Sequence, residues 1–173
     1  MKKFFMLLFL LALFGCTSNT KTFENEELSI SLPKWVQPTK ELNPNAPYQW
    51  WYAEKKFYII LNSESKQVVH DILQETEGFT ADFAGNCAYL KKEFKDQFIT
   101  TNINEKEGKL HGNNFQSMQL HARLHEYKFY YSVTYVETSD RYYQLVIWTD
   151  LDQKAIYENL IQHISTSLKI KKP

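Results

Sequence analysis

The stretch that decides the fold runs from residue 118 to residue 149 and reads MQLHARLHEYKFYYSVTYVETSDRYYQLVIWT. Apolar side chains occupy every second position in three successive runs: Met118, Leu120, Ala122 and Leu124, then Phe129, Tyr131, Val133 and Tyr135, then Tyr143, Leu145 and Ile147. A period of two is that of a β-strand with one buried face. The turn at 138–140 is too short for the crossover that parallel strands need. The stretch therefore predicts an antiparallel meander of three strands.

The segment before the meander has the period of a helix. Apolar side chains recur there at spacings of three and four, at Phe79, Phe83, Cys87, Leu90 and Phe94. This stripe indicates an amphipathic helix, with Thr80 as its N-cap. A shorter helix is expected around residues 68–73, with Gly78 as its stop. Between the longer helix and the meander we expect strands over 99–106 and 109–111, with a turn at Gly108.

Further strands precede the helices, and one helix follows the meander. Residues 28–32 alternate apolar and polar up to Pro33, and residues 48–53 and 57–62 form a predicted hairpin. The last expected element is a helix over residues 151–168, capped by Asp150. Its expected apolar stripe consists of Ile156, Leu160, Ile164 and Leu168. This order, with short connections between strands, predicts an α+β fold in which helices pack on an antiparallel β-sheet.

The order of elements resembles the PsbP/Mog1-like α/β sandwich family, in particular its small bacterial lipoprotein branch. The residues that carry the resemblance are the opening strand at 28–33 with Trp35 after it, the helix at 83–94, Gly112-Asn113 before a long strand, and the closing strand at 142–149. The resemblance covers about residues 26–170 and implies a binding or assembly domain. These motifs are structural, so they carry over no binding residue, and a fold alone does not determine function.

The first sixteen residues indicate export and lipidation. Two lysines, Lys2 and Lys3, precede an apolar run from Phe4 to Phe14, as in a signal peptide. As a helix this run would rise only ~16 Å, whereas the hydrocarbon core of a bilayer is ~30 Å thick. The sequence Leu-Phe-Gly-Cys at 13–16 resembles the lipobox of bacterial lipoproteins, in which the signal is cleaved before the cysteine and the thiol carries a lipid. We therefore expect lipidation of Cys16.

These observations divide the chain into three expected parts. Residues 1–15 are the lipoprotein signal peptide, residues 16–25 are the lipidated cysteine with a polar tether, and residues 26–173 form a single domain. Residues 17 and 18 lack an aspartate of the kind that resembles an inner-membrane retention signal. The tether also lacks the acidic cluster associated with surface display. We therefore expect a lipid-anchored protein at the periplasmic face of the outer membrane.

The net charge argues against nucleic acid as a binding partner, and the cysteine content argues against a disulfide within the chain. Lys2 and Lys3 leave with the signal peptide, so 18 basic residues remain against 20 acidic ones. A nearly neutral domain lacks the electrostatic footprint of a nucleic-acid-binding protein, and we exclude nucleic acid as a partner. Once Cys16 is lipidated, Cys87 has no cysteine within the chain with which to form a disulfide.

No residue set predicts catalysis, a cofactor or a metal site. His121 and His125 could share a metal ion on a helix, but the alternation around them predicts a strand, in which they lie ~13 Å apart. Cys87 belongs to an apolar helical stripe, so we expect a buried, unreactive thiol. Asp150 and Asp152 are explained by the start of the last helix. The acidic residues Glu24, Glu26 and Glu27 fit a solvated strand entry.

Aromatic residues make up 16% of the chain, which leaves two open hypotheses for function. If helices or loops cover both faces of the sheet, the aromatic side chains form the core. If one face is open, they form a patch for a partner or an apolar ligand. The first hypothesis is a non-enzymatic lipoprotein domain that binds another envelope protein through an exposed sheet face. The alternative is a periplasmic carrier of a hydrophobic ligand or lipid. We expect no enzyme, because no acid, base and nucleophile converge.

Overall fold

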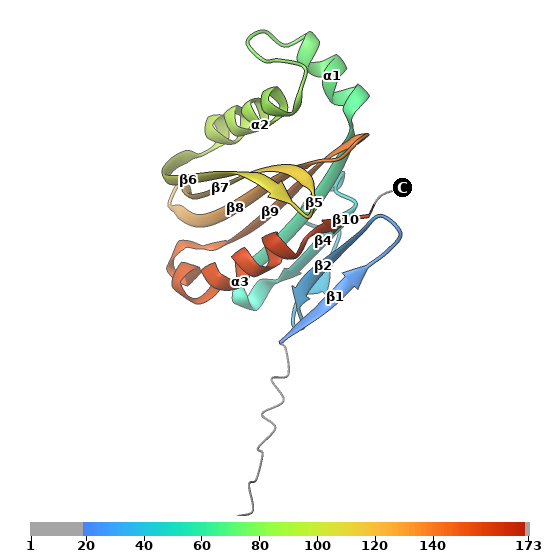
Figure 1. Cartoon of the computed structure of the whole chain (residues 1–173). Coiled ribbons are helices and arrows are strands. Elements are labelled where there is room, and N and C mark those ends of the chain that lie inside the picture. The colour runs from blue at the N-terminus through green and yellow to red at the C-terminus, as the bar shows by residue number, and fades with distance from the viewer. Residues whose placement is uncertain (1–18, 172–173) are drawn as a thin grey trace, which may run out of the picture.

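The computed structural model describes residues 19–171, which form two antiparallel sheets and three α-helices (Figure 1). The seven-stranded sheet has the order β3-β4-β5-β9-β8-β7-β6, and the three-stranded sheet has the order β1-β2-β10. The strands are β1 (Thr20–Glu24), β2 (Leu28–Pro33), β3 (Gln37–Pro38), β4 (Tyr48–Tyr52), β5 (Phe57–Ser65), β6 (Ile99–Leu110), β7 (Asn113–Leu124), β8 (Tyr127–Glu137), β9 (Arg141–Asp150) and β10 (Lys169–Ile170). The helices are α1 (Lys66–Gln74), α2 (Phe83–Gln97) and α3 (Lys154–Ser167).

The large sheet separates two layers (Figure 1). Helices α1 and α2 lie on one of its faces, and α3 lies with the small sheet on the other. The larger core cluster fills the α3 side, where Phe57, Ile59 and Leu145 of the sheet meet Ile161 and Ile164 of α3. A second cluster, with Met118, Val133 and Cys87, lies under α2. The predicted α+β fold, with helices packed on an antiparallel sheet, is confirmed.

The three predicted strands of the meander are β7, β8 and β9, and they pair in the expected antiparallel order. The predicted hairpin at 48–62 is β4–β5, whose register pairs Trp50 with Ile59. The alternation that predicted these strands arises because one face of each meets a core cluster.

The structure corrects one predicted turn and one predicted helix N-cap. Strand β6 continues through Gly108, and its hairpin turn is His111-Gly112, where φ is +50° and +91°. A two-residue hairpin turn of this kind requires positive φ at both positions, which a glycine at the second position satisfies. Helix α2 begins two residues later than the predicted cap implied, because its N-cap is Asp82 rather than Thr80. The Asp82 carboxylate accepts a hydrogen bond from the amide of Gly85 at 2.8 Å, and Thr80 donates to the same carboxylate oxygen.

The last helix also differs in detail from its prediction. A 3₁₀ turn (Leu151–Gln153) precedes α3, and the Asp150 side chain makes no capping hydrogen bond, because its carboxylate pairs with Lys56 at 2.5 Å. Ile156 is 66% exposed and so lies outside the apolar stripe. The buried face of α3 instead carries Tyr157, Ile161 and Ile164.

Residues 20–24 do not form the tether that the sequence predicted. They form β1, which pairs along its whole length with β2. The ring of Phe23 packs edge-on against Trp50 at 5.1 Å and against Tyr48 at 5.7 Å. The polar composition of this segment concealed the strand, because Phe23 is its one large apolar residue. The predicted signal peptide and the predicted lipidation site, Cys16, lie outside the described residues.

Candidate functional site

The two faces of the large sheet are unequally covered. Side chains that point toward α3 from the middle of β5 and β9 are buried, among them Ile59, Leu61 and Leu145. The alternate side chains point toward the α1–α2 layer, and they include Ile60, which is only half-buried. Helix α2 covers the β7–β8 part of this face, where Met118 and Val133 are buried. The β4–β5–β9 part beside it is therefore partly open.

An aromatic row crosses this open part of the sheet. Trp51, Tyr58, Trp148 and Tyr131 are successive cross-strand partners on β4, β5, β9 and β8. The ring of Trp148 stacks on Tyr58 at 5.0 Å and on Tyr131 at 5.7 Å. Tyr131 is buried, whereas Trp51, Tyr58 and Trp148 are half-buried. We refer to Trp51, Tyr58 and Trp148 as the aromatic row.

One wall next to this face is a loop that a single buried glutamine holds in place. The Gln49 side-chain oxygen accepts hydrogen bonds from the amides of Leu42 and Asn43 at 3.0 and 2.9 Å. Its amide nitrogen donates to the carbonyl oxygens of Asn43 and Ala46. The loop is thereby clamped above β4. The opposite wall is α2, which Lys91 ties to Glu105 of β6 at 3.0 Å.

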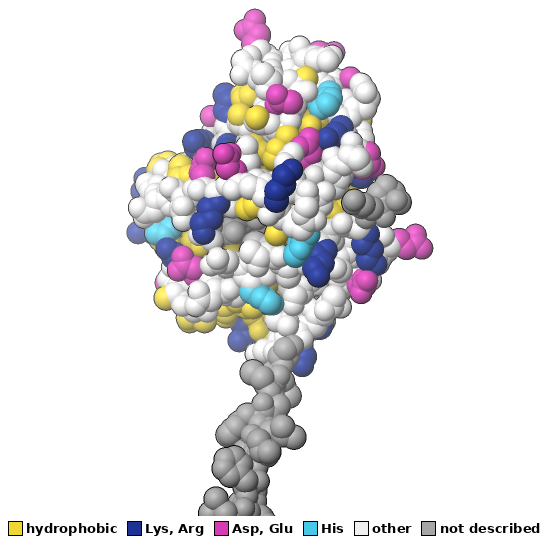
Figure 2. Space-filling model, in the orientation of Figure 1, with side chains coloured by type: hydrophobic (Ala, Val, Ile, Leu, Met, Phe, Trp, Pro, Cys, Tyr) yellow, Lys and Arg dark blue, Asp and Glu magenta, His cyan; other side chains and the backbone are white. Residues whose placement is uncertain are grey.

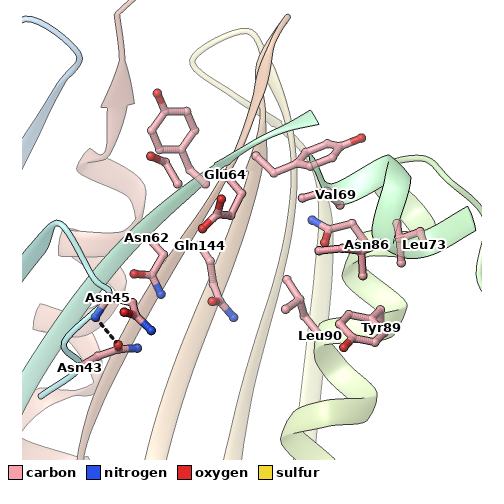
Figure 3. Close-up of a pocket in the computed structure, with 14 residues that line it drawn as sticks. Asn43, Asn45, Asn62, Glu64, Val69, Leu73, Asn86, Tyr89, Leu90 and Gln144 are labelled. Atoms are coloured by element: carbon pink, nitrogen blue, oxygen red, sulfur yellow. Dashed lines mark hydrogen bonds between the residues drawn. The ribbon is translucent and has the colours of Figure 1, made fainter. Parts of the chain in front are cut away.

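A pocket of about 220 Å³ lies between these walls (Figure 3). Five amide side chains from four parts of the chain line it, and we call it the amide pocket: Asn43 and Asn45 from the loop, Asn62 from β5, Asn86 from α2 and Gln144 from β9. Asn62 and Gln144 are cross-strand partners on its floor. Val69 and Leu73 of α1 and Leu90 of α2 form an apolar side.

Asn86 is the most unusual residue of the amide pocket. It is 6% exposed, its side chain points into the pocket in Figure 3, and that side chain has no hydrogen-bond partner among the described residues. Its amide atoms are not among the buried polar atoms that lack a partner, so they reach the open space of the pocket, where a ligand can bond them. The lining includes one carboxylate, that of Glu64, and no lysine or arginine. The pocket is thus nearly uncharged and rich in hydrogen-bonding groups.

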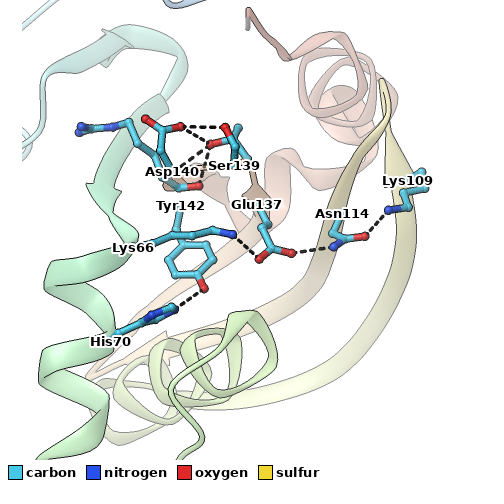
Figure 4. A network of polar contacts seen from close by, with 10 residues as sticks. Lys66, His70, Lys109, Asn114, Glu137, Ser139, Asp140 and Tyr142 are labelled. Atoms are coloured by element: carbon cyan, nitrogen blue, oxygen red, sulfur yellow. Dashed lines mark hydrogen bonds and ion pairs between the residues drawn. The ribbon is translucent and has the colours of Figure 1, made fainter. Parts of the chain in front are cut away.

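A polar network holds α1 beside the amide pocket (Figure 4). Lys66 of α1 pairs with Glu137 of β8 at 2.7 Å, and Glu137 also accepts from Asn114 of β7 at 2.6 Å. Burial alone would raise the pKa of Glu137, but the hydrogen bonds from Asn114 and Lys66 outweigh it and lower the pKa. His70 contacts the Tyr142 hydroxyl at 3.0 Å, and burial raises the pKa of Tyr142 to about 12. The carboxylate is therefore ionised and the phenol protonated at neutral pH.

A wider groove of about 750 Å³ lies between the β6–β7 turn, the β8–β9 turn and the end of β10. Charges of both signs line it, including Glu26, Arg141 and Lys171. Lys171 pairs with Glu24 at 2.8 Å, and Arg141 donates to Ser63. Because the two cations Lys171 and Arg141 already have partners, we take the amide pocket and the aromatic row as the candidate site. On the face that Figure 2 shows, basic and acidic side chains are interspersed.

The histidines considered in the sequence do not come together. His121 lies on β7, where its Nδ1 contacts the Asn102 amide at 2.8 Å, and burial lowers its pKa. His125 lies in the β7–β8 turn with φ of +55°. Within residues 19–171, no three histidine, cysteine or acidic side chains are grouped closely enough to hold a metal ion.

The other candidate site residues from the sequence are either buried in the core, paired with a lysine, or placed in a turn or connection. Cys87 is 1% exposed in the cluster under α2, and burial raises its pKa to about 12. Asp150 pairs with Lys56, and Glu24 with Lys171. Asp152 lies in the turn before α3, and Glu26 and Glu27 in the connection between β1 and β2. Among the described helices, none combines the length and apolarity that crossing a bilayer requires.

Sequence reasoning missed the amide pocket. A signal for part of it was present, because Gln144 interrupts the apolar run of residues 142–148 and Asn62 directly follows the apolar run of residues 57–61. The strand alternation placed them on the face opposite Leu61 and Leu145, but it did not say that the two strands would pair at these positions. Asn43, Asn45 and Asn86 carried no such signal, because loops and helix starts commonly contain asparagine.

No family model matches the chain, and no curated protein matches it in sequence. Three solved structures share its fold. Cyanobacterial PsbP (CyanoP) from Synechocystis sp. PCC 6803 has 9% sequence identity and a TM-score of 0.57 over 88% of this chain and 93% of its own. The Ran-binding protein Mog1p from Saccharomyces cerevisiae has 10% identity and a TM-score of 0.54 over 88% and 95%. LpqN from Mycobacterium tuberculosis, which is involved in cell envelope biogenesis, has 12% identity and a TM-score of 0.53 over 88% and 91%.

Proposed function

Because the chain has a PsbP/Mog1-like fold, we propose that it is a lipid-anchored, non-enzymatic binding domain that docks another cell-envelope protein on the open face of β4, β5 and β9. The aromatic row is the observation that carries this proposal. Large, half-buried aromatic side chains are enriched where proteins bind one another. The stacking of Trp148 between Tyr58 and Tyr131 holds its ring in place before a partner arrives.

The surroundings of the reactive groups favour binding over catalysis. A thiol with a pKa of about 12 is protonated at neutral pH, so Cys87 is a poor nucleophile. His121 and His125 lie at separate places on β7 and its turn, and neither is beside Cys87 in the core cluster under α2. The structural neighbours named as Ran-binding and as involved in envelope biogenesis are consistent with a binding role.

A carrier of a hydrophobic ligand or lipid is the weaker alternative. Pockets for drug-sized ligands usually enclose ~300–1,000 Å³ and are mainly apolar. The lining of the amide pocket is also mainly apolar in exposed area, but its volume of about 220 Å³ is below that range. Most aromatic side chains that could have lined a cavity, including Phe57 and Tyr130, instead fill the core.

Photo-crosslinking in living cells tests the docking proposal. A photoreactive residue placed at Trp51 or Tyr58 is expected to give one discrete adduct with an envelope protein. The same residue at Ile156, which is 66% exposed on α3, is the matched control on the other side of the molecule. An adduct from position 156 alone, or identical adducts from all three positions, would contradict docking at the open face.

The lipid anchor belongs to the same proposal and has its own test. We propose that Cys16 carries the lipid and that the domain is held at the periplasmic face of the outer membrane. Residues 17–19 alone separate Cys16 from β1, so the chain between Cys16 and Thr20 spans at most ~14 Å. Cells fed labelled palmitate are expected to label the protein, and Cys16→Ala should abolish the label and release the protein from the membrane fraction. Persistent labelling of the variant would refute lipidation at this residue.

A further inference from the structure

We infer that the amide pocket binds one neutral sugar residue of an envelope glycan. This inference goes beyond the docking of a protein and concerns the end of the open face away from the aromatic row. It begins with Asn86, a residue that is 6% exposed, whose amide faces the pocket and has no partner among the described residues. Because this amide reaches the open space of the pocket, a ligand that offers both an acceptor and a donor can bond it.

The number of amide side chains in the pocket indicates which class of ligand it can bind. Each asparagine or glutamine side chain supplies two N–H donors and one carbonyl acceptor. The five amides of the pocket converge from the loop, β5, β9 and α2 on about 220 Å³. The backbone of a peptide residue in that space would offer only one N–H and one C=O. A sugar ring carries several hydroxyls, and each of them both donates and accepts. The density of hydrogen-bonding groups therefore favours a sugar over a peptide.

The charge of the lining determines which sugars fit. No lysine or arginine lines the pocket, and the carboxylate of Glu64 does. The Glu64 carboxylate is exposed, and it adds a negative charge to a lining that has no cation to attract an anionic ligand. The geometry thus selects an uncharged sugar and disfavours a uronic acid or a sugar phosphate.

The apolar side of the pocket completes the match. Val69 and Leu73 of α1 and Leu90 of α2 lie opposite the amides of the sheet and the loop (Figure 3). A pyranose ring has hydroxyls around its edge and C–H groups on its faces, so one face can pack on these side chains while the edge bonds the amides. A pocket below the ~300 Å³ of drug-sized sites holds one ring rather than several. Asn45 and Ile72 at the rim are exposed, so the neighbouring sugars of a chain can leave the pocket.

Calorimetric titration of the full-length lipoprotein tests this inference. The protein is purified in a detergent whose headgroup is not a sugar, and it is titrated with N-acetylated chitotriose and with maltotriose. We expect at least one of these neutral trisaccharides to bind with a Kd of about 1 mM or lower. Trigalacturonate, which is anionic, is expected to bind at least tenfold more weakly. The capped peptide acetyl-Gln-Asn-Gln-amide is the probe for a peptide site.

Two variants locate the binding in the pocket. Asn86→Leu keeps the branched shape of the side chain and removes the amide, and we expect about a tenfold or greater loss of affinity. Asn62→Ala acts on a different element and is expected to weaken binding as well, so a folding defect in either variant leaves the other as a test. Asn159→Leu, at an exposed position on α3, is the matched control and should leave affinity unchanged.

The titration results that would overturn the sugar site differ from the crosslinking results that would overturn the docking proposal. Failure of both neutral trisaccharides to bind, equal binding of trigalacturonate, or binding of the peptide alone would overturn the inference. Binding that survives both Asn86→Leu and Asn62→Ala would overturn it too. Asn86→Leu should leave the photo-crosslinks from positions 51 and 58 intact, so loss of the sugar site and loss of the protein partner give different results.

Discussion

Asn86 and Cys87 are adjacent on α2 and have opposite chemical surroundings. The thiol of Cys87 points into the cluster that contains Met118 and Tyr135, whereas the Asn86 amide points into the amide pocket. One helical residue step turns the side chain by about 100°, so the helix separates a core position from a pocket position. The predicted burial of Cys87 is confirmed.

The burial of Cys87 predicts that its thiol reacts slowly with alkylating reagents. With a pKa of about 12, the thiol is almost entirely protonated at pH 8, and its surroundings exclude reagents. We expect iodoacetamide to leave Cys87 unmodified in the native protein and to modify it in guanidinium chloride, as followed by mass spectrometry of the peptide containing residue 87. Ala88→Cys, at the next and exposed position of α2, is the control and should react readily in the native state. Equal rates at positions 87 and 88 would refute the assigned burial.

Glu137 predicts a pH-dependent contribution to stability. Its pKa in the folded protein is lowered from 4.5, because the hydrogen bonds from Asn114 and Lys66 outweigh the effect of burial. A lowered folded-state pKa means that the stabilisation is present above about pH 4.5 and is lost as the pH falls through the folded-state value. We expect Glu137→Gln to reduce the free energy of unfolding by about 1–3 kcal/mol at pH 7.

Urea unfolding from pH 7 to pH 2.5 measures this contribution. The difference between the natural chain and Glu137→Gln should shrink below the ordinary glutamate pKa of 4.5. Glu126→Gln, at an exposed position in the β7–β8 turn, is the control and should show no such trend. A difference that stays constant over this pH range would show that the Glu137 carboxylate does not carry the effect.

At the scale of elements, the start of α2 depends on a glycine. A Cβ at Gly85 would overlap the carbonyl oxygen of Thr80, which is a backbone atom and cannot move aside as a side-chain end can. The same turn holds the Asp82 cap, so the loop before α2 lies tightly against its first turn. This close approach positions Asn86 one residue later.

We expect Gly85→Ala to lower the free energy of unfolding by about 1–3 kcal/mol, even though alanine has the better helix propensity. Thermal unfolding followed by circular dichroism measures the change. Ala84→Ser, at the exposed neighbouring position, should have little effect. An increase in stability for Gly85→Ala would mean that the loop gives way without cost.

At the scale of the whole molecule, β1 joins the N-terminal segment to the core. Phe23 packs against Tyr48 and Trp50, and the small sheet it belongs to covers the same core cluster as α3. A chain that begins at residue 26 should therefore be less stable than one that begins at residue 19 by roughly 2 kcal/mol or more. Phe23→Ala in the longer chain should reproduce part of the loss. Equal stability of the two chains would restore the tether interpretation, and the comparison requires only thermal unfolding.

Much of the architecture could be predicted from local patterns. The alternation in residues 118–149 predicted β7, β8 and β9, and the spacing from Phe79 to Phe94 predicted α2, because each element must present one apolar face to a core. Element ends were less predictable. Gly108 and Gly112 are both possible turn positions, and only the register of β6 on β7 shows that the chain turns at Gly112.

The sequence by itself determined the long strands and the three helices, since these depend on the periodicity of continuous segments, and its composition predicted an export signal, but it did not reveal β1. Only the tertiary structure decided which sheet face is left open and which side chains meet there. Asn43 and Gln144 lie about a hundred positions apart in the chain, and they line one pocket because β5 pairs with β9 and Gln49 clamps the loop over β4. Such convergence depends on strand pairing and helix placement, which are long-range packing results that no local pattern encodes.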